Sequence, residues 1–352
     1  MMRFEHVSLP QRVRFGTGEA AENLAAEIEA LGASRVMVIV SDGERELGHA
    51  VAGGLPVARW HHEVVMHVPL EVAERARQAA MAEHVDALVS IGGGSTTGLA
   101  KAVALTTGLP IVAVPTTYAG SEATDVWGLT EGARKTTGTD DRVLPRAVVY
   151  DAALTIGLPV QLSVASGLNA LAHCVDSMWA PRADPIDRAL AAEGIRALRV
   201  GLPLIVKEPT GTEGREHALY GAYLSARAFA SAGSGLHHKI CHVLGGMFNL
   251  PHAQTHAVVL PHVLAFNAPC ADDARRRIAV AFDAPQAVEG LRRLYDRLDA
   301  PRALRDLGMP EDGIDAAAAA VLDVVPSGNP RPVTLAAITE LLQAAWEGTD
   351  PR

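Results

Sequence analysis

The first 150 residues alternate short apolar runs with stretches of helical periodicity, and this alternation limits the possible folds more than any other feature. The apolar runs are rich in β-branched residues, which favour strands. They occupy residues 35–40, 85–91, 110–115 and 147–150, and helical stretches occupy 19–31, 72–82 and 95–106. Buried strands alternating with helices are typical of a parallel sheet covered on both faces. The sequence therefore predicts an α/β, Rossmann-like domain, and residues 11–15 are compatible with an opening hairpin.

The strand patterns stop after about residue 157, where the chain becomes rich in Ala and Leu with helical periodicity. The expected helices cover residues 184–198, 214–230, 271–280, 285–298, 315–324 and 335–346. We therefore expect a dinucleotide-binding α/β domain over residues 1–157 and an all-helical catalytic domain over residues 158–352.

Composition excludes several classes of function. The net charge of −9 argues against a nucleic-acid partner. No apolar run reaches the roughly 18 residues of a membrane span, and the opening residues are too polar for a signal peptide. The three cysteines form no CxxC pair and are expected to be reduced thiols. We expect a cytoplasmic protein that contacts neither nucleic acid nor membrane.

Three glycines, Gly92, Gly93 and Gly94, close one of the apolar runs, and Ser95 opens the helix that follows. Glycines at such a junction let the backbone approach a phosphate, which the free N–H groups of the helix N-terminus attract. The spacing differs from the usual GxGxxG fingerprint, and a tight turn is the simpler alternative.

Further polar residues follow the strand ends, where parallel sheets bind ligands. The run after residue 115 offers Thr116, Thr117, Tyr118 and Ser121 as cofactor contacts, or is merely a polar loop. Asp42 is placed to accept a hydrogen bond from an adenosine ribose, and Lys101 could reach a ribose hydroxyl; a turn residue and a solvated helix lysine are the alternatives. A carboxylate near the ribose repels a 2′-phosphate, so Asp42 would favour NADH over NADPH.

Histidines are concentrated in the helical half, where five of the chain's 14 lie between residues 236 and 256. His238 and His242 are four residues apart, as are Asn169 and His173, so each pair occupies one face of a helix. Together with His252, three histidines and a carboxylate would make a four-ligand Zn or Fe site. Asn169 supplies only a neutral amide oxygen, which should lower the affinity for a metal without excluding one.

Several ordered motifs resemble the iron-containing alcohol dehydrogenase family over nearly the whole chain. They are residues 15–18, 92–95, 115–122, 169–173, 238–252, 260–263 with Asn267, and 328–331. The resemblance implies a dinucleotide-binding α/β domain, a helical domain and a homodimer. The family's metal ligands are an Asp and three His, which match Asn169, His173, His238 and His252; His242 matches a further active-site His that is not a ligand.

Two positions depart from the metal-dependent members, because Asn169 and Gly98 stand where those members carry Asp. These departures, with residues 115–122, 134–137 and 236–242, resemble the maleylacetate reductase branch. Members of that branch use NADH or NADPH to reduce the carbon–carbon double bond of maleylacetate to 3-oxoadipate during aromatic-compound degradation, and they are generally regarded as not needing the metal. The resemblance therefore implies a degenerate metal site and no required metal.

The implied chemistry assigns roles to the histidines. Conjugate reduction of an enone places negative charge on the ketone oxygen as an enolate, which hydrogen-bond donors can stabilise. His242 is the first candidate for proton donor, with His238, His173 and His252 orienting the substrate. The substrate is a dicarboxylate, and its candidate contacts are Asn169, Tyr118, Lys239, Lys135 and Arg331.

Three other functions remain open. A metal-dependent alcohol or polyol dehydrogenase of the same family is the main alternative. A sugar-phosphate cyclase on the same scaffold would need a metal, which Asn169 weakens. A non-catalytic nucleotide-binding protein would have no use for the retained histidines.

Overall fold

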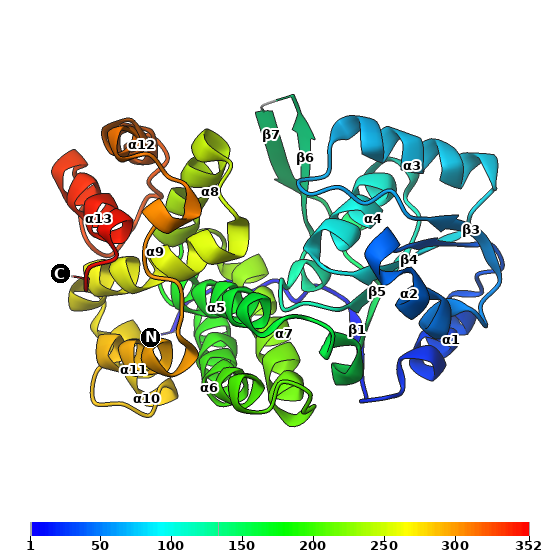
Figure 1. Cartoon of the computed structure of the whole chain (residues 1–352), viewed down its shortest axis with the longest axis horizontal. Coiled ribbons are helices and arrows are strands. Elements are labelled where there is room, and N and C mark those ends of the chain that lie inside the picture. The colour runs from blue at the N-terminus through cyan, green and yellow to red at the C-terminus, as the bar shows by residue number, and fades with distance from the viewer. Residues whose placement is uncertain (1, 133, 352) are drawn as a thin grey trace. The chain divides into compact units, whose positions relative to one another are not determined.

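The computed structural model describes residues 2–132 and 134–351, which divide into two compact units. The α/β unit runs from Ser8 to Leu158. The helical unit begins at Pro159 and includes the N-terminal segment up to Val7. Figure 1 labels the elements of both units.

Strands and helices alternate through most of the α/β unit, whereas the helical unit contains helices alone among its described elements. The α/β unit contains β1 (Arg12–Phe15), α1 (Ala20–Leu31), β2 (Val36–Ile39), α2 (Arg45–Ala52), β3 (Val57–His61), α3 (Leu70–Ala82), β4 (Ala87–Gly92), α4 (Gly94–Thr107), β5 (Ile111–Pro115), β6 (Val126–Glu131), β7 (Arg134–Thr139) and β8 (Ala147–Tyr150). The helical unit contains α5 (Val160–Ser177), α6 (Pro185–Lys207), α7 (Glu213–Ala232), α8 (Leu236–Phe248), α9 (His252–Asn267), α10 (Asp272–Ala281), α11 (Ala287–Leu298), α12 (Ile314–Leu322) and α13 (Leu335–Glu347).

The six-stranded sheet is parallel throughout, in the order β1-β8-β5-β4-β2-β3. Its central strands are buried on both sides, because apolar side chains of α3 and α4 cover one face and those of α1 and α2 cover the other. Figure 1 shows these two helix pairs on opposite sides of the strands. The predicted fold class, an α/β domain followed by an all-helical region, is confirmed.

The edges of the sheet differ from the prediction. Residues 11–15 do not open a hairpin: β1 pairs in parallel with β8, and the side chains of Arg12 and Arg14 bind the buried carboxylate of Glu27 on α1. The sequence pattern also missed β3 and the antiparallel β6–β7 hairpin. These strands are only partly buried, so they lack the continuous apolar run that marks a central strand.

The helical unit is built from two packed groups. Helices α5, α6 and α7 pack against one another, and α8, α9, α12 and α13 share a second apolar core. Helix α9 also packs against α5 and α8, which brings the histidine-bearing segments together. Helix α6 is longer than predicted, because it continues through Pro203 to Lys207. None of the helices in the described ranges is long and apolar enough to cross a membrane.

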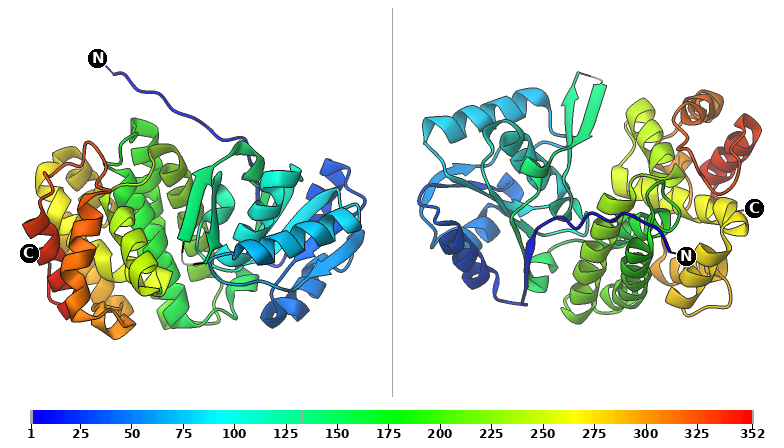
Figure 2. Two further views of the ribbon diagram at one scale, coloured as in Figure 1. Left: turned by 90° about the horizontal axis from the view of Figure 1, so that it is seen from above. Right: turned by 180° about the vertical axis from the view of Figure 1, so that it is seen from behind.

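The N-terminal segment belongs to the helical unit because of a specific anchor. Nδ1 of His6 lies 2.8 Å from a carboxylate oxygen of Asp184. Asp184 also caps the N-terminus of α6 in a capping box with Asp187. Figure 2 shows this stretch in dark blue, beginning at the label N.

Candidate functional site

Three helices of the helical unit each present a pair of polar side chains one turn apart. These pairs form what we call the histidine cluster: Asn169 and His173 on α5, His238 and His242 on α8, and His252 and His256 on α9. The ring centroids are 4.8 Å apart for His173 and His238, 4.9 Å for His238 and His256, and 4.4 Å for His252 and His256. The structure therefore brings together every histidine that the sequence analysis selected, and adds His256.

A buried carboxylate orients the most central ring. Asp176 accepts a hydrogen bond of 2.7 Å from Nδ1 of His238, and another of 2.9 Å from the backbone N–H of Gly235. Burial raises the pKa of Asp176. With Nδ1 bonded to the carboxylate, Nε2 of His238 faces the opposite way, the arrangement found behind metal-binding histidines. The sequence analysis missed Asp176, although it follows His173 by three residues and so lies on the same side of α5.

Several buried polar atoms of the cluster have no hydrogen-bond partner within the described part of the chain. They are Oδ1 of Asn169, Nδ1 of His173, Nε2 of His238 and Nε2 of His256. Burial lowers the pKa of His173 to about 4 and that of His238 well below its usual value, which keeps these rings neutral. Neutral imidazoles with unpaired nitrogens are metal-ligating groups, and leaving such atoms buried without a partner is costly. Asn169, His173, His238 and His252 therefore carry donor atoms of the kind that bind a divalent metal ion, but the ligand atoms of these three histidines do not form a group within 4.8 Å of one another in the described part of the chain.

A second pair of buried histidines escaped the sequence analysis. Nε2 of His237 lies 2.9 Å from Nδ1 of His256, and Sγ of Cys241 lies 3.6 Å from the same nitrogen of His237. Both rings are fully buried. His256 could have been recognised from the sequence, because its four-residue spacing from His252 repeats the spacing of the other two pairs.

The remaining predicted residues of the helical unit differ in their surroundings. His242 and His252 are exposed, and Lys239 is half-buried beside His238, whose pKa its charge helps to lower. Arg331 is exposed and its guanidinium lies over the ring of Phe266, 4.4 Å from the centroid, so part of its role is packing.

The predicted substrate contact Lys135 falls on the β7 strand, and its side chain lies outside the part that the structure describes. It remains a prediction from the sequence.

Gly92, Gly93 and Gly94 form the turn where β4 ends and α4 begins, which we call the glycine turn. It has room for a ligand only because these residues lack side chains. Gly92 has φ +149°, and a Cβ there would lie 2.4 Å from the hydroxyl of Thr96. A Cβ on Gly93 would meet the side chain of Thr117 at 3.0 Å. Helix α4 begins here without a side-chain cap and with no acidic residue in its first turn. This N-terminus therefore fits a phosphate group of a dinucleotide.

The glycine turn also lies where the strand order reverses. Strands β2 and β4 are neighbours in the sheet, while the strand that follows β2 in the chain, β3, lies on its other side. Ligands of doubly wound sheets bind at such a point. Asp42 follows β2 there; its side chain is 74% exposed and forms an ion pair with Arg45, which lowers the pKa of Asp42. Glu44, which the sequence analysis missed, accepts a hydrogen bond of 2.7 Å from the hydroxyl of Thr116.

Two predicted cofactor contacts are wrong in this geometry. Lys101 is completely buried, and its Nζ donates to the carbonyl oxygens of Thr124 and Val126 and to the hydroxyl of Thr124. These bonds hold the amine inside the protein, so Lys101 anchors the start of β6 and does not reach a ribose. The side chain of Tyr118 is also completely buried, with its hydroxyl 3.5 Å from that of Thr155, so the hydroxyl is not presented to a ligand.

The remaining candidates near the glycine turn stay predictions. Ser95, Thr117 and Ser121 are partly accessible at the start of α4 and in the loop after β5, while Thr116 is buried beside Glu44.

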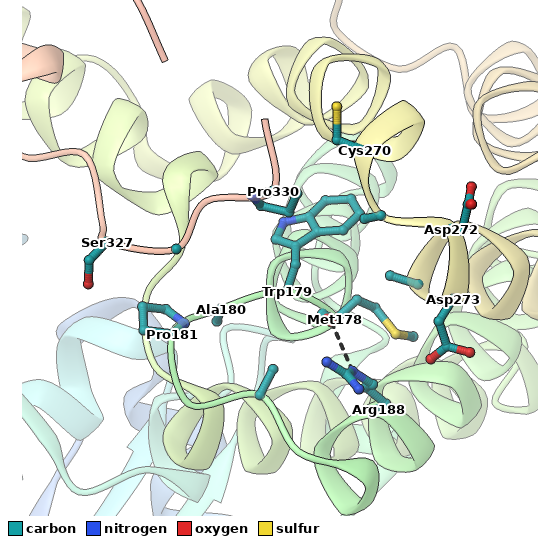
Figure 3. Close-up of a pocket in the computed structure, with 14 residues that line it drawn as sticks. Met178, Trp179, Ala180, Pro181, Arg188, Cys270, Asp272, Asp273, Ser327 and Pro330 are labelled. Carbon is teal, nitrogen blue, oxygen red and sulfur yellow. Dashed lines mark hydrogen bonds between the residues drawn. The ribbon is translucent and has the colours of Figure 1, made fainter. Parts of the chain in front are cut away.

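A cavity of about 480 Å³ lies elsewhere in the helical unit. It is lined by residues near 178–183, 270–274 and 327–330 (Figure 3). Arg188 also lines it and donates a hydrogen bond of 3.1 Å to the carbonyl oxygen of Met178. None of its lining residues belongs to the histidine cluster, so it is not the candidate site.

Comparison with known proteins gives a consistent result across the chain. Residues 10–152 match the model of the iron-containing alcohol dehydrogenases, and residues 163–346 match the C-terminal model of the Fe-containing alcohol dehydrogenase family. The chain is 46% identical to a maleylacetate reductase of Burkholderia cepacia over 97% of each sequence. An iron-containing alcohol dehydrogenase structure from Corynebacterium glutamicum is 61% identical, with a TM-score of 0.99 over 100% of this chain and 99% of that one. A maleylacetate reductase structure from Agrobacterium tumefaciens is 42% identical, with a TM-score of 0.95 over 100% of both chains.

These matches correct one expectation from the sequence. The substitution of Asn169 for a carboxylate led us to expect that no metal is required. The matched family is iron-containing, and similar structures carry the same description, so a bound metal is implied. The error was to weigh one lost carboxylate above the buried, unpartnered nitrogens that remain.

Proposed function

This chain belongs to the iron-containing alcohol dehydrogenase family, and on that premise we propose that it is a maleylacetate reductase that uses NADH or NADPH. One observation carries the proposal: the chain is 46% identical to a maleylacetate reductase over 97% of its length. The neutral Asn169 within the histidine cluster is compatible with an enolate, whose charge is spread over two atoms and needs less stabilisation than an alkoxide.

The reaction adds one hydride and one proton across the carbon–carbon double bond. The hydride goes to the alkene carbon β to the ketone, and the π electrons move to the ketone oxygen to form an enolate. The α carbon then takes a proton as the ketone is restored. The alkene is reduced by two electrons, which oxidation of bound NADH or NADPH would supply, and the product is 3-oxoadipate.

When bound, a reduced nicotinamide would supply the hydride, and a divalent metal ion at Asn169, His173, His238 and His252 would supply a Lewis acid. The chain itself supplies positioning, since Asp176 holds His238 in one tautomer.

Proton transfer requires an accessible group near the cluster. His242 is exposed, sits one turn beyond His238, and its ring centroid is 6.3 Å from that of His238. We assign it the role of proton donor to the α carbon. Lys239 and Arg331 are the cationic candidates for the two substrate carboxylates.

The nucleotide site is assigned to the α/β unit. Gly92, Gly93 and Gly94 with the N-terminus of α4 would hold the phosphates. Asp42 would accept a hydrogen bond from the adenosine ribose, and its negative charge favours NADH over NADPH.

The broader setting follows from the family and the composition. We propose a nucleotide-binding domain over residues 1–157 and a catalytic domain over 158–352, a homodimer, and a cytoplasmic enzyme without a nucleic-acid partner. A metal-dependent alcohol or polyol dehydrogenase is the second candidate, favoured by the similarity to the Corynebacterium glutamicum protein described as an iron-containing alcohol dehydrogenase.

Two absorbance measurements separate the two candidate functions. The decay of NADH absorbance is followed with maleylacetate, and NAD⁺ reduction is followed with a panel of alcohols and diols, using protein of measured metal content. Rapid turnover of maleylacetate with slow alcohol oxidation supports the proposal. The reverse order refutes it. Removal of metal with dipicolinate should lower turnover, and Fe²⁺ or Zn²⁺ should restore it.

A further inference from the structure

Two buried carboxylates and one histidine meet where the N-terminal segment docks against α6. Nδ1 of His6 lies 2.8 Å from Oδ2 of Asp184 and 3.6 Å from Oδ1 of Asp187. A ligand atom from each of the three residues lies within 4.8 Å of those from the other two. The side chains of Asp184 and Asp187 are 2% and 0% exposed, and that of His6 is 13% exposed. We call this group the N-terminal triad; none of its members belongs to the histidine cluster.

The capping box of α6 fixes the direction of both carboxylates. Oδ1 of Asp184 accepts hydrogen bonds from the backbone N–H groups of Ile186 and Asp187, at 2.7 and 2.9 Å. Oδ2 of Asp187 accepts one of 3.3 Å from the backbone N–H of Asp184. Each carboxylate therefore uses one oxygen for the helix terminus and keeps the other near His6. Ligands that are already held in place need little reorganisation to bind an ion.

The charge of these carboxylates is not balanced. Oδ1 of Asp187 is buried and has no hydrogen-bond partner within the described ranges. Among the described residues, no lysine or arginine forms an ion pair with Asp184 or Asp187, and His6 is their one basic partner. A protonated His6 would offset one of the two negative charges. Buried charges without full compensation are costly, so the triad favours a cation of higher charge.

The distances within the triad suit a small divalent ion. Atoms bound at about 2.1 Å to one ion are roughly 2.8–3.6 Å apart when the angle between them is about 85–120°. The two distances from Nδ1 of His6 fall in this range. The hydroxyl oxygen of Ser231 lies 3.3 Å from the same nitrogen and offers a weak fourth donor. One imidazole nitrogen with two carboxylate oxygens is a donor set that Zn²⁺ accepts.

We propose that the N-terminal triad is a structural metal site that binds Zn²⁺ through Nδ1 of His6, Oδ2 of Asp184 and Oδ1 of Asp187. The ion balances both carboxylates and ties residues 2–7 to the start of α6, within the helical unit. The imidazole favours Zn²⁺ over Mg²⁺ and Ca²⁺, which prefer oxygen ligands alone. This site takes no part in the reduction and does not depend on which compound is reduced.

Zinc binding by the full-length chain tests the site without an activity assay. Protein stripped with dipicolinate is titrated with Zn²⁺ against a chromogenic chelator, and the number of ions bound per chain is recorded. His6→Gln removes Nδ1 and keeps a polar side chain, whereas Asp187→Asn keeps the shape of the side chain and removes one charge. Each variant should bind one Zn²⁺ fewer than the parent, or bind it about 100-fold more weakly, because a ligand is lost. Any ion at the histidine cluster is common to parent and variants and cancels in the comparison.

A second measurement locates the ion at the N-terminal segment. Trypsin cleaves after Arg3, three residues before His6. Saturating Zn²⁺ should slow this cleavage about fivefold in the parent, because a ligand that binds the docked state holds the segment in place. It should have no such effect in Asp187→Asn.

Two exposed residues outside the triad provide matched controls. His84→Gln and Asp299→Asn should bind Zn²⁺ like the parent. Circular dichroism first establishes that each variant is folded. If His6→Gln and Asp187→Asn both bind as many Zn²⁺ ions as the parent with the same affinities, the triad is not a metal site and His6 anchors the segment as an imidazolium alone. A parent chain that binds no Zn²⁺ also refutes the proposal.

Discussion

The structure assigns Lys101 the role of anchoring the start of β6, in place of the predicted contact with a ribose. This role can be tested through the effect of pH on stability. Its Nζ donates to oxygens of Thr124 and Val126, and burial lowers the pKa of Lys101 to about 7, against the opposing charges of Glu122 and Asp125. In the unfolded chain the same group titrates near its ordinary value of 10.5.

The sign of the effect follows from proton linkage. Between about pH 7 and 10.5 the unfolded chain binds a proton at Lys101 that the folded chain does not, so stability rises with pH across this window. The gain in stability that this titration produces is complete above the pKa of Lys101 in the unfolded chain. It is lost as the pH falls to the pKa of Lys101 in the folded chain. At about 1.36 kcal/mol per pKa unit, raising the pH from 6.5 to 9 should increase the free energy of unfolding by about 2.5 kcal/mol.

The substitution Lys101→Met keeps the length of the side chain and removes the titration. Urea unfolding of parent and variant, followed by circular dichroism at pH 6.5 and 9, should show that the difference in their stabilities changes by about 2.5 kcal/mol. The affinity for NADH, measured by fluorescence, should change less than about threefold. Lys207→Met, at a side chain that is 74% exposed, should show neither effect.

The reasoning about Lys101 fails if the stabilities of parent and Lys101→Met change in parallel with pH. It fails also if the main effect is a tenfold or greater loss of NADH affinity, because that result would return Lys101 to the ribose.

Three further predictions concern the two candidate sites. His242→Asn should lower kcat by about 100-fold or more with little change in KM, because it removes the proposed proton donor; steady-state kinetics with maleylacetate measures this. Asp176→Asn should weaken metal binding 10- to 100-fold, in a competition assay with a chromogenic chelator, because the orienting bond to His238 is weakened. Gly92→Ala should destabilise the chain by about 1–3 kcal/mol in thermal unfolding, since its Cβ would clash with Thr96.

Two of these predictions, those for Gly92 and His242, have a matched control variant. Gly54→Ala, where a Cβ would meet nothing within 4 Å, should leave the melting temperature almost unchanged. His217→Asn, at a half-buried histidine on α7, should retain normal kcat. Unchanged turnover in His242→Asn, parental metal affinity in Asp176→Asn, or a parental melting temperature in Gly92→Ala would contradict the corresponding assignment.

The sequence predicted the parts of the fold that depend on a single strong pattern. The central strands β2, β4, β5 and β8 were found because both their faces are buried, so almost every residue is apolar. In the edge strand β3 and the β6–β7 hairpin, apolar and polar residues follow no clear pattern, so the sequence analysis missed these strands. Boundaries also failed where a proline is tolerated, as in α6, whose packing against α5 and α7 outweighs the local cost of Pro203.

The candidate site was predictable where spacing alone identifies a shared helix face. The pairs on α5 and α8 were recognised in this way, and the pair on α9 could have been. The partners that orient the rings, Asp176 and His237, depend on which helices pack together, which spacing does not reveal. Lys101 was misassigned for the same reason, because a lysine on a helix is expected to face solvent until the elements packed against it are known.

The anchor between His6 and Asp184 has a consequence for the order of folding. These two residues are 178 positions apart in the chain, and the whole α/β unit lies between them. During synthesis, residues 8–158 can complete their own sheet while the N-terminal segment still lacks its partner. Closing a contact over such a separation carries a large entropic cost early in folding. We therefore expect residues 2–7 to dock against the N-terminus of α6 late in folding, after the helices of this unit have assembled.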